Sequence, residues 1–184
     1  WATHGGVTAA NAHPHFSCDG KIAVVHNGII ENHADLRREL ETDHRFVSKT
    51  DTEVIPHLIE KLYAEAKGDI LRAMSLAIDR LRGAFAIGVI HSDHPAKLSV
   101  ARVKCPMVIG LGDGENFMAS DIPALMPHTR RIVPLEEREI ASIASTEVRI
   151  FDPHLRPRSR RPLEVNWHAE AAARDGHPHH MLRE

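Results

Sequence analysis

Apolar residues in the first half of the chain recur three or four positions apart, a spacing typical of helices that bury one face. The spacing predicts two helices over residues 32–41 and 70–81. Between them it predicts a third helix, which carries a single apolar stripe formed by Val54, Leu58 and Leu62. We therefore expect a helical block that packs its apolar faces on a common core.

Polar residues at the expected helix ends predict where these helices begin and stop. Asn32 is suited to cap the first helix, and Thr50-x-x-Glu53 has the form of a capping box for the next one. Pro56 is expected to kink or loosen the first turns of that helix. Gly83 is expected to end the last one.

Strand-like runs occupy the rest of the chain. Residues 21–26 form a β-branched run that predicts a buried strand ending at the turn dipeptide Asn27-Gly28. A short helix is expected over 122–126. Further strands are expected over residues 84–90, 98–103, 107–110, 116–119, 131–135, 139–143 and 148–151. Because many of these runs are continuously apolar and the helices and strands form separate blocks, we predict an α+β layer fold with sheets covered on both faces.

The composition is that of one soluble globular domain: 184 residues, 42% hydrophobic and 26% charged. The formal net charge of −2 disfavours nucleic acid or an anionic membrane as a partner. No apolar run approaches the ~18 residues of a membrane span, so we expect no membrane association and a cytoplasmic protein. Since the sequence starts at Trp1 without an initiator Met, we expect it to be part of a longer chain.

The cysteines and histidines offer weak chemical signals. Cys18 and Cys105 lack CxxC spacing, and each is expected to be a buried free thiol. As a nucleophile Cys18 would need a nearby base, which its neighbours in sequence do not supply. The pair His13-x-His15 and the tail histidines have spacings that a metal can use, but no carboxylate or thiol accompanies them at ligand spacing. We therefore expect surface histidines, no metal and no cofactor; the tail histidines are His177, His179 and His180.

Glycine and acidic motifs are compatible with both structural and functional roles. Gly110–Gly114 lacks the Lys-Ser/Thr of a phosphate-binding loop and predicts a hairpin. Asn27 and Gly28 together offer a side-chain amide and a backbone N–H, two neutral donors that can stabilise an oxyanion, although this dipeptide after a strand is more often a simple turn. Asp51 precedes a predicted helix, where an acid favourably meets the helix dipole.

Five stretches stand out when they are read together: Trp1–Gly5, Asn11–His15, Ile22–Asn32, Thr50–Val54 and Gly114–Asp121. In this order they resemble the class II glutamine amidotransferase domains of the glucosamine-6-phosphate synthases. The resemblance extends over nearly all of the chain. It implies a glutaminase domain over residues 1–168 and the start of a linker to a sugar-isomerase domain over residues 169–184.

The resemblance implies a four-layer αββα sandwich of the N-terminal-nucleophile hydrolase type, incomplete at its N-terminus. It implies that Asn27 and Gly28 form the oxyanion hole and that Asp51 binds the α-ammonium group of L-glutamine. Trp1 would close the pocket, and Thr3 and His4 would help to hold the substrate carboxylate. The implied partners are L-glutamine, fructose 6-phosphate through the isomerase domain, and a second copy of the parent chain in a homodimer.

The sequence departs from the family pattern at the nucleophile, which is an N-terminal cysteine that precedes the equivalent of Trp1. We therefore expect the 184 residues alone to be inactive, and expect an upstream segment that ends in Arg to restore turnover. A non-catalytic glutamine-binding module is the main alternative. A metal-dependent hydrolase that uses His13 and His15 is a further one.

Overall fold

The structure is a computed structural model of the chain and describes residues 5–166. Three α-helices follow one another in the first half, and short 3₁₀ turns η1 (Ala9–Asn11) and η2 (Ile122–Ala124) accompany the strands. The helices are α1 (His33–Leu40), α2 (Val54–Glu65) and α3 (Ile70–Arg80). The strands are β1 (His15–Phe16), β2 (Ile22–Ile30), β3 (Gly83–His91), β4 (Leu98–Val103), β5 (Val108–Leu111), β6 (Asn116–Ala119), β7 (Arg131–Pro134), β8 (Ile140–Ile143), β9 (Val148–Phe151), β10 (Pro157–Arg158) and β11 (Leu163–Glu164).

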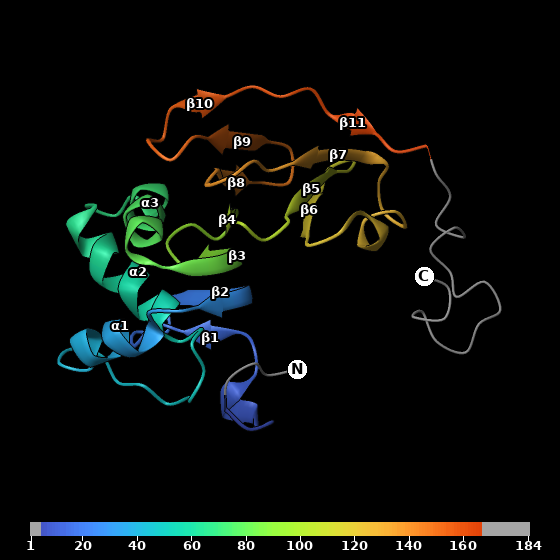
Figure 1. Ribbon diagram of the computed structural model, residues 1–184. Coiled ribbons are helices and arrows are strands. Elements are labelled where there is room, and N and C mark those ends of the chain that lie inside the picture. The colour runs from blue at the N-terminus through green and yellow to red at the C-terminus, as the bar shows by residue number, and fades with distance from the viewer. Residues whose placement is uncertain (1–4, 167–184) are drawn as a thin grey trace, which may run out of the picture.

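The strands form two antiparallel sheets. The larger sheet has seven strands in the order β1-β2-β3-β4-β8-β9-β10, and the smaller has four in the order β11-β7-β5-β6. Helices α1 to α3 gather on one side of the larger sheet, and the smaller sheet lies on its other side (Figure 1). The segment that follows β9 contains β10 and β11, and so runs from one sheet to the other.

The larger sheet is the middle layer, because alternate residues of its strands pack in two different hydrophobic cores, one on each face of the sheet. On β3, Phe85 and Ile87 pack with the helices, whereas Ala86 between them packs with Ile109 and Val133 of the smaller sheet. This two-sided burial explains the continuous apolar runs in the sequence, and it confirms the predicted α+β class. Within residues 5–166 the layers are helices, sheet and sheet; the second helical layer stays a prediction.

The strand β2 is longer than its sequence predicts. It continues through Asn27 and Gly28 to Ile30, so the prediction of a turn at this dipeptide is wrong. Gly28 has φ +116°, and a Cβ at this position would lie 2.0 Å from the carbonyl oxygen of Ala84 on β3. Only glycine fits both the backbone angle and the close approach, which is why a turn-like dipeptide occurs within a strand.

The predicted caps of α1 and α2 are also wrong. Asn32 makes no cap bond; its side chain instead donates to the carbonyl of Arg80 and accepts the N–H of Arg82, which ties the end of β2 to the α3–β3 connection. Glu53 makes no cap bond to α2 either. Among the α-helices of residues 5–166, only α3 has a side-chain cap: Asp69 accepts the N–H groups of residues 71 and 72.

The other predicted elements appear within about three residues of their expected ends. Pro56 stands at the third position of α2, where it removes no intrahelical hydrogen bond, and the helix continues to Glu65. Gly83 begins β3 and does not cap α3, whose C-cap is Leu81. Within residues 5–166 no helix is long and apolar enough to cross a membrane. The expected domain boundary after residue 168 lies outside the described residues.

Candidate active site

The second half of β2 exposes the predicted oxyanion residues. Asn27 is opposite Ala86 and Gly28 is opposite Phe85 on β3, and both Asn27 and Gly28 are exposed. A cavity of about 90 Å³ lies beside Asn27, and Met107 and Met118 from the smaller sheet's side also line it. The structure therefore places a side-chain amide next to a small hollow between the two sheets.

Asp51 lies at the same part of β2. Its Oδ2 atom accepts the N–H of Ile30 at 2.8 Å, and the residue is only 2% exposed. Ile30 is two residues beyond Gly28, so the structure brings together Asn27, Gly28 and Asp51, three of the residues predicted for the site. The helix-dipole explanation of Asp51 is incomplete, because α2 begins three residues later and the carboxylate is directed to the strand.

A network of hydroxyl and imidazole groups holds the segment that carries Asp51. Thr52 Oγ1 lies 2.9 Å from His26 Nδ1, and Thr50 Oγ1 lies 3.2 Å from His15 Nε2. The residues on both sides of Asp51 are thus hydrogen-bonded to strands β1 and β2. These side chains are buried, which makes their hydrogen bonds costly to break.

Glu53 fixes the same segment from its other end. Its carboxylate accepts the N–H groups of Val47 and Ser48 at 2.8 and 2.7 Å and the Ser48 hydroxyl at 2.6 Å. Burial by itself raises the pKa of Glu53, but the interaction with His57 and these hydrogen bonds outweigh it and lower the pKa to about 2. The ionised carboxylate is therefore part of the folded loop, which is the reason that Glu53 does not cap α2.

His26 is neutral at physiological pH. Burial lowers its pKa from 6.5 to about 4, and the neighbouring His13 and His15 act in the same direction, against the attraction of Asp51. Its Nε2 atom is buried and has no hydrogen-bond partner among residues 5–166. The pKa values of His13 and His15 are also lowered, chiefly by burial. Sequence reasoning missed this role of His26, Thr50 and Thr52; the sequence offers only the two hydroxyl residues on either side of Asp51 as a signal.

The other candidates have different outcomes. Trp1, Thr3 and His4 lie outside the described residues. His13 and His15 stack edge to face, 5.6 Å between ring centroids, and belong to no group of three or more metal-binding side chains in the described part of the chain. Gly110–Gly114 joins β5 to β6 as the predicted hairpin.

The prediction that Cys18 and Cys105 are buried is wrong. Cys18 is exposed, whereas Cys105 is half-buried, and both are free thiols as expected. The sequence neighbours of Cys18 supply no base, but His44 and His57 both come within 3.7 Å of its sulfur in space. The sequence signal for this cluster is His57-x-x-Glu60 on one face of α2; Cys18 and His44 could not be assigned to it because they come from separate connections.

Three comparisons show which known proteins the chain is similar to. Residues 6–127 match the family model described as glutamine amidotransferase domain. The glutamine–fructose-6-phosphate aminotransferases (isomerizing) of Thermus thermophilus and Methanothermobacter thermautotrophicus are 49% and 45% identical to the chain. Both matches cover 100% of this chain but only 30% and 31% of the relatives, so the chain spans less than a third of their length.

The fold has a solved counterpart in the glutamine phosphoribosylpyrophosphate amidotransferase from B. subtilis, with a TM-score of 0.67 and 22% identity. That likeness covers 83% of this chain and 34% of the other, and it supports the fold alone. The family model covers about two thirds of the sequence, and its residues include the strand with Asn27 and Gly28 and the loop with Asp51. The chain therefore belongs to the glutamine amidotransferase domain family.

Proposed function

We propose that the chain is the glutaminase part of a glutamine–fructose-6-phosphate aminotransferase, which releases ammonia from L-glutamine to aminate fructose 6-phosphate for hexosamine synthesis. One observation carries the proposal: the buried carboxylate of Asp51 is anchored to β2 two residues beyond Gly28. A zwitterionic amide needs both an acid for its ammonium group and neutral donors for its reacting carbonyl. Asn27, Gly28 and the residue that anchors Asp51, Ile30, lie within four successive residues of β2.

Asp51 is the group that binds the α-ammonium of glutamine. The N–H of Ile30 fixes the orientation of its carboxylate, which is already desolvated at 2% exposure. An ion pair formed at such a buried acid is stronger than one at the surface, because water screens it less. The anchored carboxylate therefore sets the position of the substrate along β2.

Asn27 and Gly28 stabilise the oxyanion. In an antiparallel strand the N–H groups of residues two apart point to the same edge, so we expect the N–H of Gly28 on the edge where Ile30 meets Asp51. The amide of Asn27 is exposed beside it. One such donor contributes on the order of 10²–10³ in turnover in other acyl-transfer enzymes.

The remaining parts of the proposal follow the resemblance. The nucleophile is an N-terminal cysteine that is not among these 184 residues, while Trp1, Thr3 and His4 complete the glutamine pocket. Residues 1–168 form the glutaminase domain and residues 169–184 begin the linker to the isomerase domain, through which the parent chain forms a homodimer. We place the protein in the cytoplasm, where its free cysteines stay reduced, without nucleic-acid or membrane partners.

Calorimetric titration of L-glutamine into the chain tests the binding half of the proposal. We expect Asp51→Asn to weaken binding by about 30-fold or more, because it removes one partner of a desolvated charge pair. Asp113→Asn, at the exposed tip of the β5–β6 hairpin, is the matched control and should leave the affinity unchanged. Equal affinities for the Asp51→Asn variant and the unaltered chain would refute the assignment of Asp51.

Glutamate release tests the catalytic half. The 184 residues alone should bind glutamine without turnover, and a chain extended by its upstream residues should hydrolyse it. Asn27→Ala in the extended chain should lower kcat by about 10²-fold with little change in KM. A thioester on Cys18, or an extended chain that binds glutamine without any turnover, would contradict the proposal; the second result would indicate a non-catalytic binding module.

A further inference from the structure

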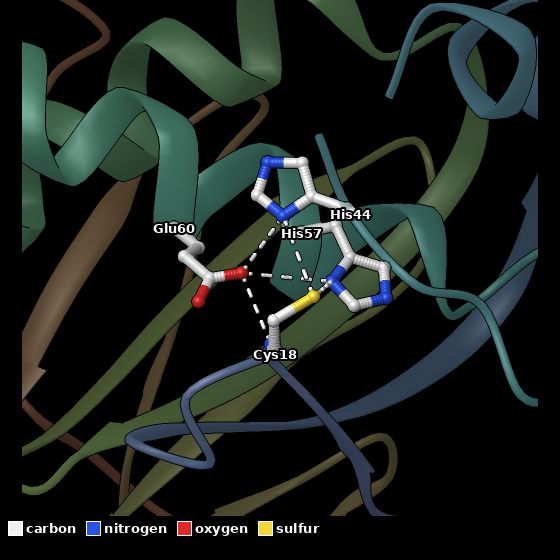
Figure 2. Close-up of side chains that lie close together, drawn as sticks. All are labelled: Cys18, His44, His57 and Glu60. Carbon is white, nitrogen blue, oxygen red and sulfur yellow. Dashed lines mark hydrogen bonds and ion pairs between the residues drawn. The ribbon is translucent and has the colours of Figure 1, made fainter. Parts of the chain in front are cut away.

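Four side chains with metal-binding atoms converge on the helical side of the larger sheet. Cys18 comes from the turn between β1 and β2, His44 from the connection between α1 and α2, and His57 and Glu60 from one face of α2. All four point toward one another (Figure 2), and their ligand atoms lie within 4.8 Å of each other. None of these residues belongs to the proposed glutamine site.

The distances fit one small cation with four ligands. For Zn–S near 2.3 Å and Zn–N or Zn–O near 2.1 Å, a tetrahedron places sulfur about 3.6 Å from nitrogen, and nitrogen about 3.4 Å from oxygen. Cys18 Sγ lies 3.7 Å from Nδ1 of His44 and 3.6 Å from Nδ1 of His57. Nδ1 of His57 lies 3.6 Å from Oε2 of Glu60.

One contact is shorter than a shared cation requires. Nδ1 of His44 lies 2.9 Å from Oε2 of Glu60, the length of a hydrogen bond. Replacing the proton between these atoms by a cation needs them to separate by only about 0.5 Å, since the tetrahedral distance is about 3.4 Å. His44 is on an irregular connection, where such a shift disturbs no helix or strand.

Surrounding groups orient the four ligands. The N–H of Arg45 donates to Cys18 Sγ at 3.2 Å and fixes the position of the sulfur. The N–H groups of Cys18 and Asp19 donate to the two oxygens of Glu60 at 3.0 and 3.1 Å. Interactions of this kind hold first-shell ligands in metal proteins.

His57 is also oriented for binding through Nδ1. Its side chain is 2% exposed, and the ring meets Phe46 edge to face at 4.5 Å between centroids. Its other nitrogen, Nε2, lies 3.7 Å from Oε1 of Glu53. At this distance Nε2 makes no hydrogen bond to a described residue, but Glu53 lies on the side of the ring where a metal-bound histidine usually has a carboxylate as its outer partner.

We propose that Cys18, His44, His57 and Glu60 bind one Zn²⁺ ion as a four-coordinate structural site. The mixture of one thiolate, two imidazoles and one carboxylate suits zinc, whereas Mg²⁺ and Ca²⁺ prefer oxygen ligands alone. On binding, zinc displaces the thiol proton of Cys18 and the proton between His44 and Glu60. Four protein ligands leave no open position for a substrate, so the ion fastens the β1–β2 turn to α2.

Zinc titration in competition with a chelating dye, with zinc content measured by mass spectrometry, tests this proposal. His177, His179 and His180 are replaced by Gln in every protein compared, so that the tail histidines do not bind metal. We expect one zinc per chain. Loss of an outer-shell partner alone costs 10–100-fold in metal affinity, so Cys18→Ser and His57→Gln should each weaken binding by at least about 100-fold.

Matched variants elsewhere in the chain are the controls. Cys105→Ser and His13→Gln remove the same side-chain types outside the cluster and should leave zinc affinity unchanged. Cobalt as a substitute ion should give the visible bands of a tetrahedral site, and the sulfur-to-cobalt charge-transfer band should be lost in Cys18→Ser. Zinc binding that survives both Cys18→Ser and His57→Gln would overturn the proposal.

Alkylation of the protein in which Cys18 and His57 are unchanged gives a test that does not depend on whether a variant folds. Cys18 is exposed, so iodoacetamide should modify it in zinc-free protein. Zinc at ten times its Kd should slow this reaction about tenfold, because only about a tenth of the sites remain free. An unchanged rate with zinc present would refute the site.

Discussion

Acidification should destabilise the folded chain through His26. Burial lowers the pKa of His26 to about 4, whereas the same group in the unfolded chain titrates near 6.5. The unfolded state therefore takes up the proton first as the pH falls, and protonation favours unfolding. The contribution of neutral His26 to stability is complete above pH 6.5 and is lost between that value and about 4.

The size of the effect follows from the two pKa values. Each unit of difference corresponds to about 1.4 kcal/mol, so a shift from 6.5 to about 4 removes about 3 kcal/mol once His26 is fully protonated. By about pH 5 the loss is already about 2 kcal/mol. Small domains have a total stability of about 5–15 kcal/mol, so a loss of this size is easily measured.

Urea unfolding followed by circular dichroism at about pH 7.5 and about pH 5 measures the loss. His13 and His15 also have lowered pKa values and destabilise the chain on acidification, so a variant is needed to isolate His26. We expect the pH-dependent loss to be about 2 kcal/mol smaller in His26→Gln than in the unaltered chain. A chelator in all samples keeps the Cys18 cluster free of metal. Equal pH dependence in the two proteins would refute the reasoning.

Three further predictions concern the strand and the two sites. Gly28→Ala should cost at least about 2 kcal/mol in urea unfolding, because a Cβ would lie 2.0 Å from Ala84 O at φ +116°, whereas Gly6→Ala meets nothing within 4 Å and should be neutral. Asn32→Ala should cost about 1–3 kcal/mol, since it leaves the Arg80 carbonyl and the Arg82 N–H without their partner; a loss below about 0.5 kcal/mol would contradict this. Zinc should tighten glutamine binding measured by calorimetry, and equal glutamine affinity with zinc and with chelator would show that the sites are independent.

The helices and long strands could be predicted because their patterns are local. Apolar spacing on α2 and continuous apolar runs on β3 and β4 each reflect burial within one element, which the sequence records directly. The end of β2 could not be predicted, because the need for glycine at position 28 arises from Ala84, a residue on another strand. Glycine is favoured both in a turn and where two strands approach closely, so the sequence alone does not distinguish the two.

Part of the candidate site could be proposed from the sequence because its residues belong to continuous motifs. Asn27 and Gly28 lie on β2, and Asp51 is hydrogen-bonded to the same strand through Ile30. The capping prediction for Glu53 failed because its carboxylate accepts the N–H groups of residues 47 and 48 instead of an N–H group at the start of α2. The cluster around Cys18 was missed because its ligands come from three separate parts of the chain, and pairing over 26 or 39 residues has no local pattern.

The two proposed sites meet in the connection between α1 and α2. His44 precedes the segment that carries Asp51, and His57 follows it, so a metal bound to both closes the segment into a loop. Closing a short loop reduces the number of conformations of the segment before glutamine binds. Less conformational entropy is then lost when glutamine binds Asp51. Hydrogen bonds from Thr50 and Thr52 hold the middle of the same loop on β1 and β2. A structural ion at its ends and a hydroxyl–imidazole network at its centre would together keep one buried carboxylate in position for its substrate.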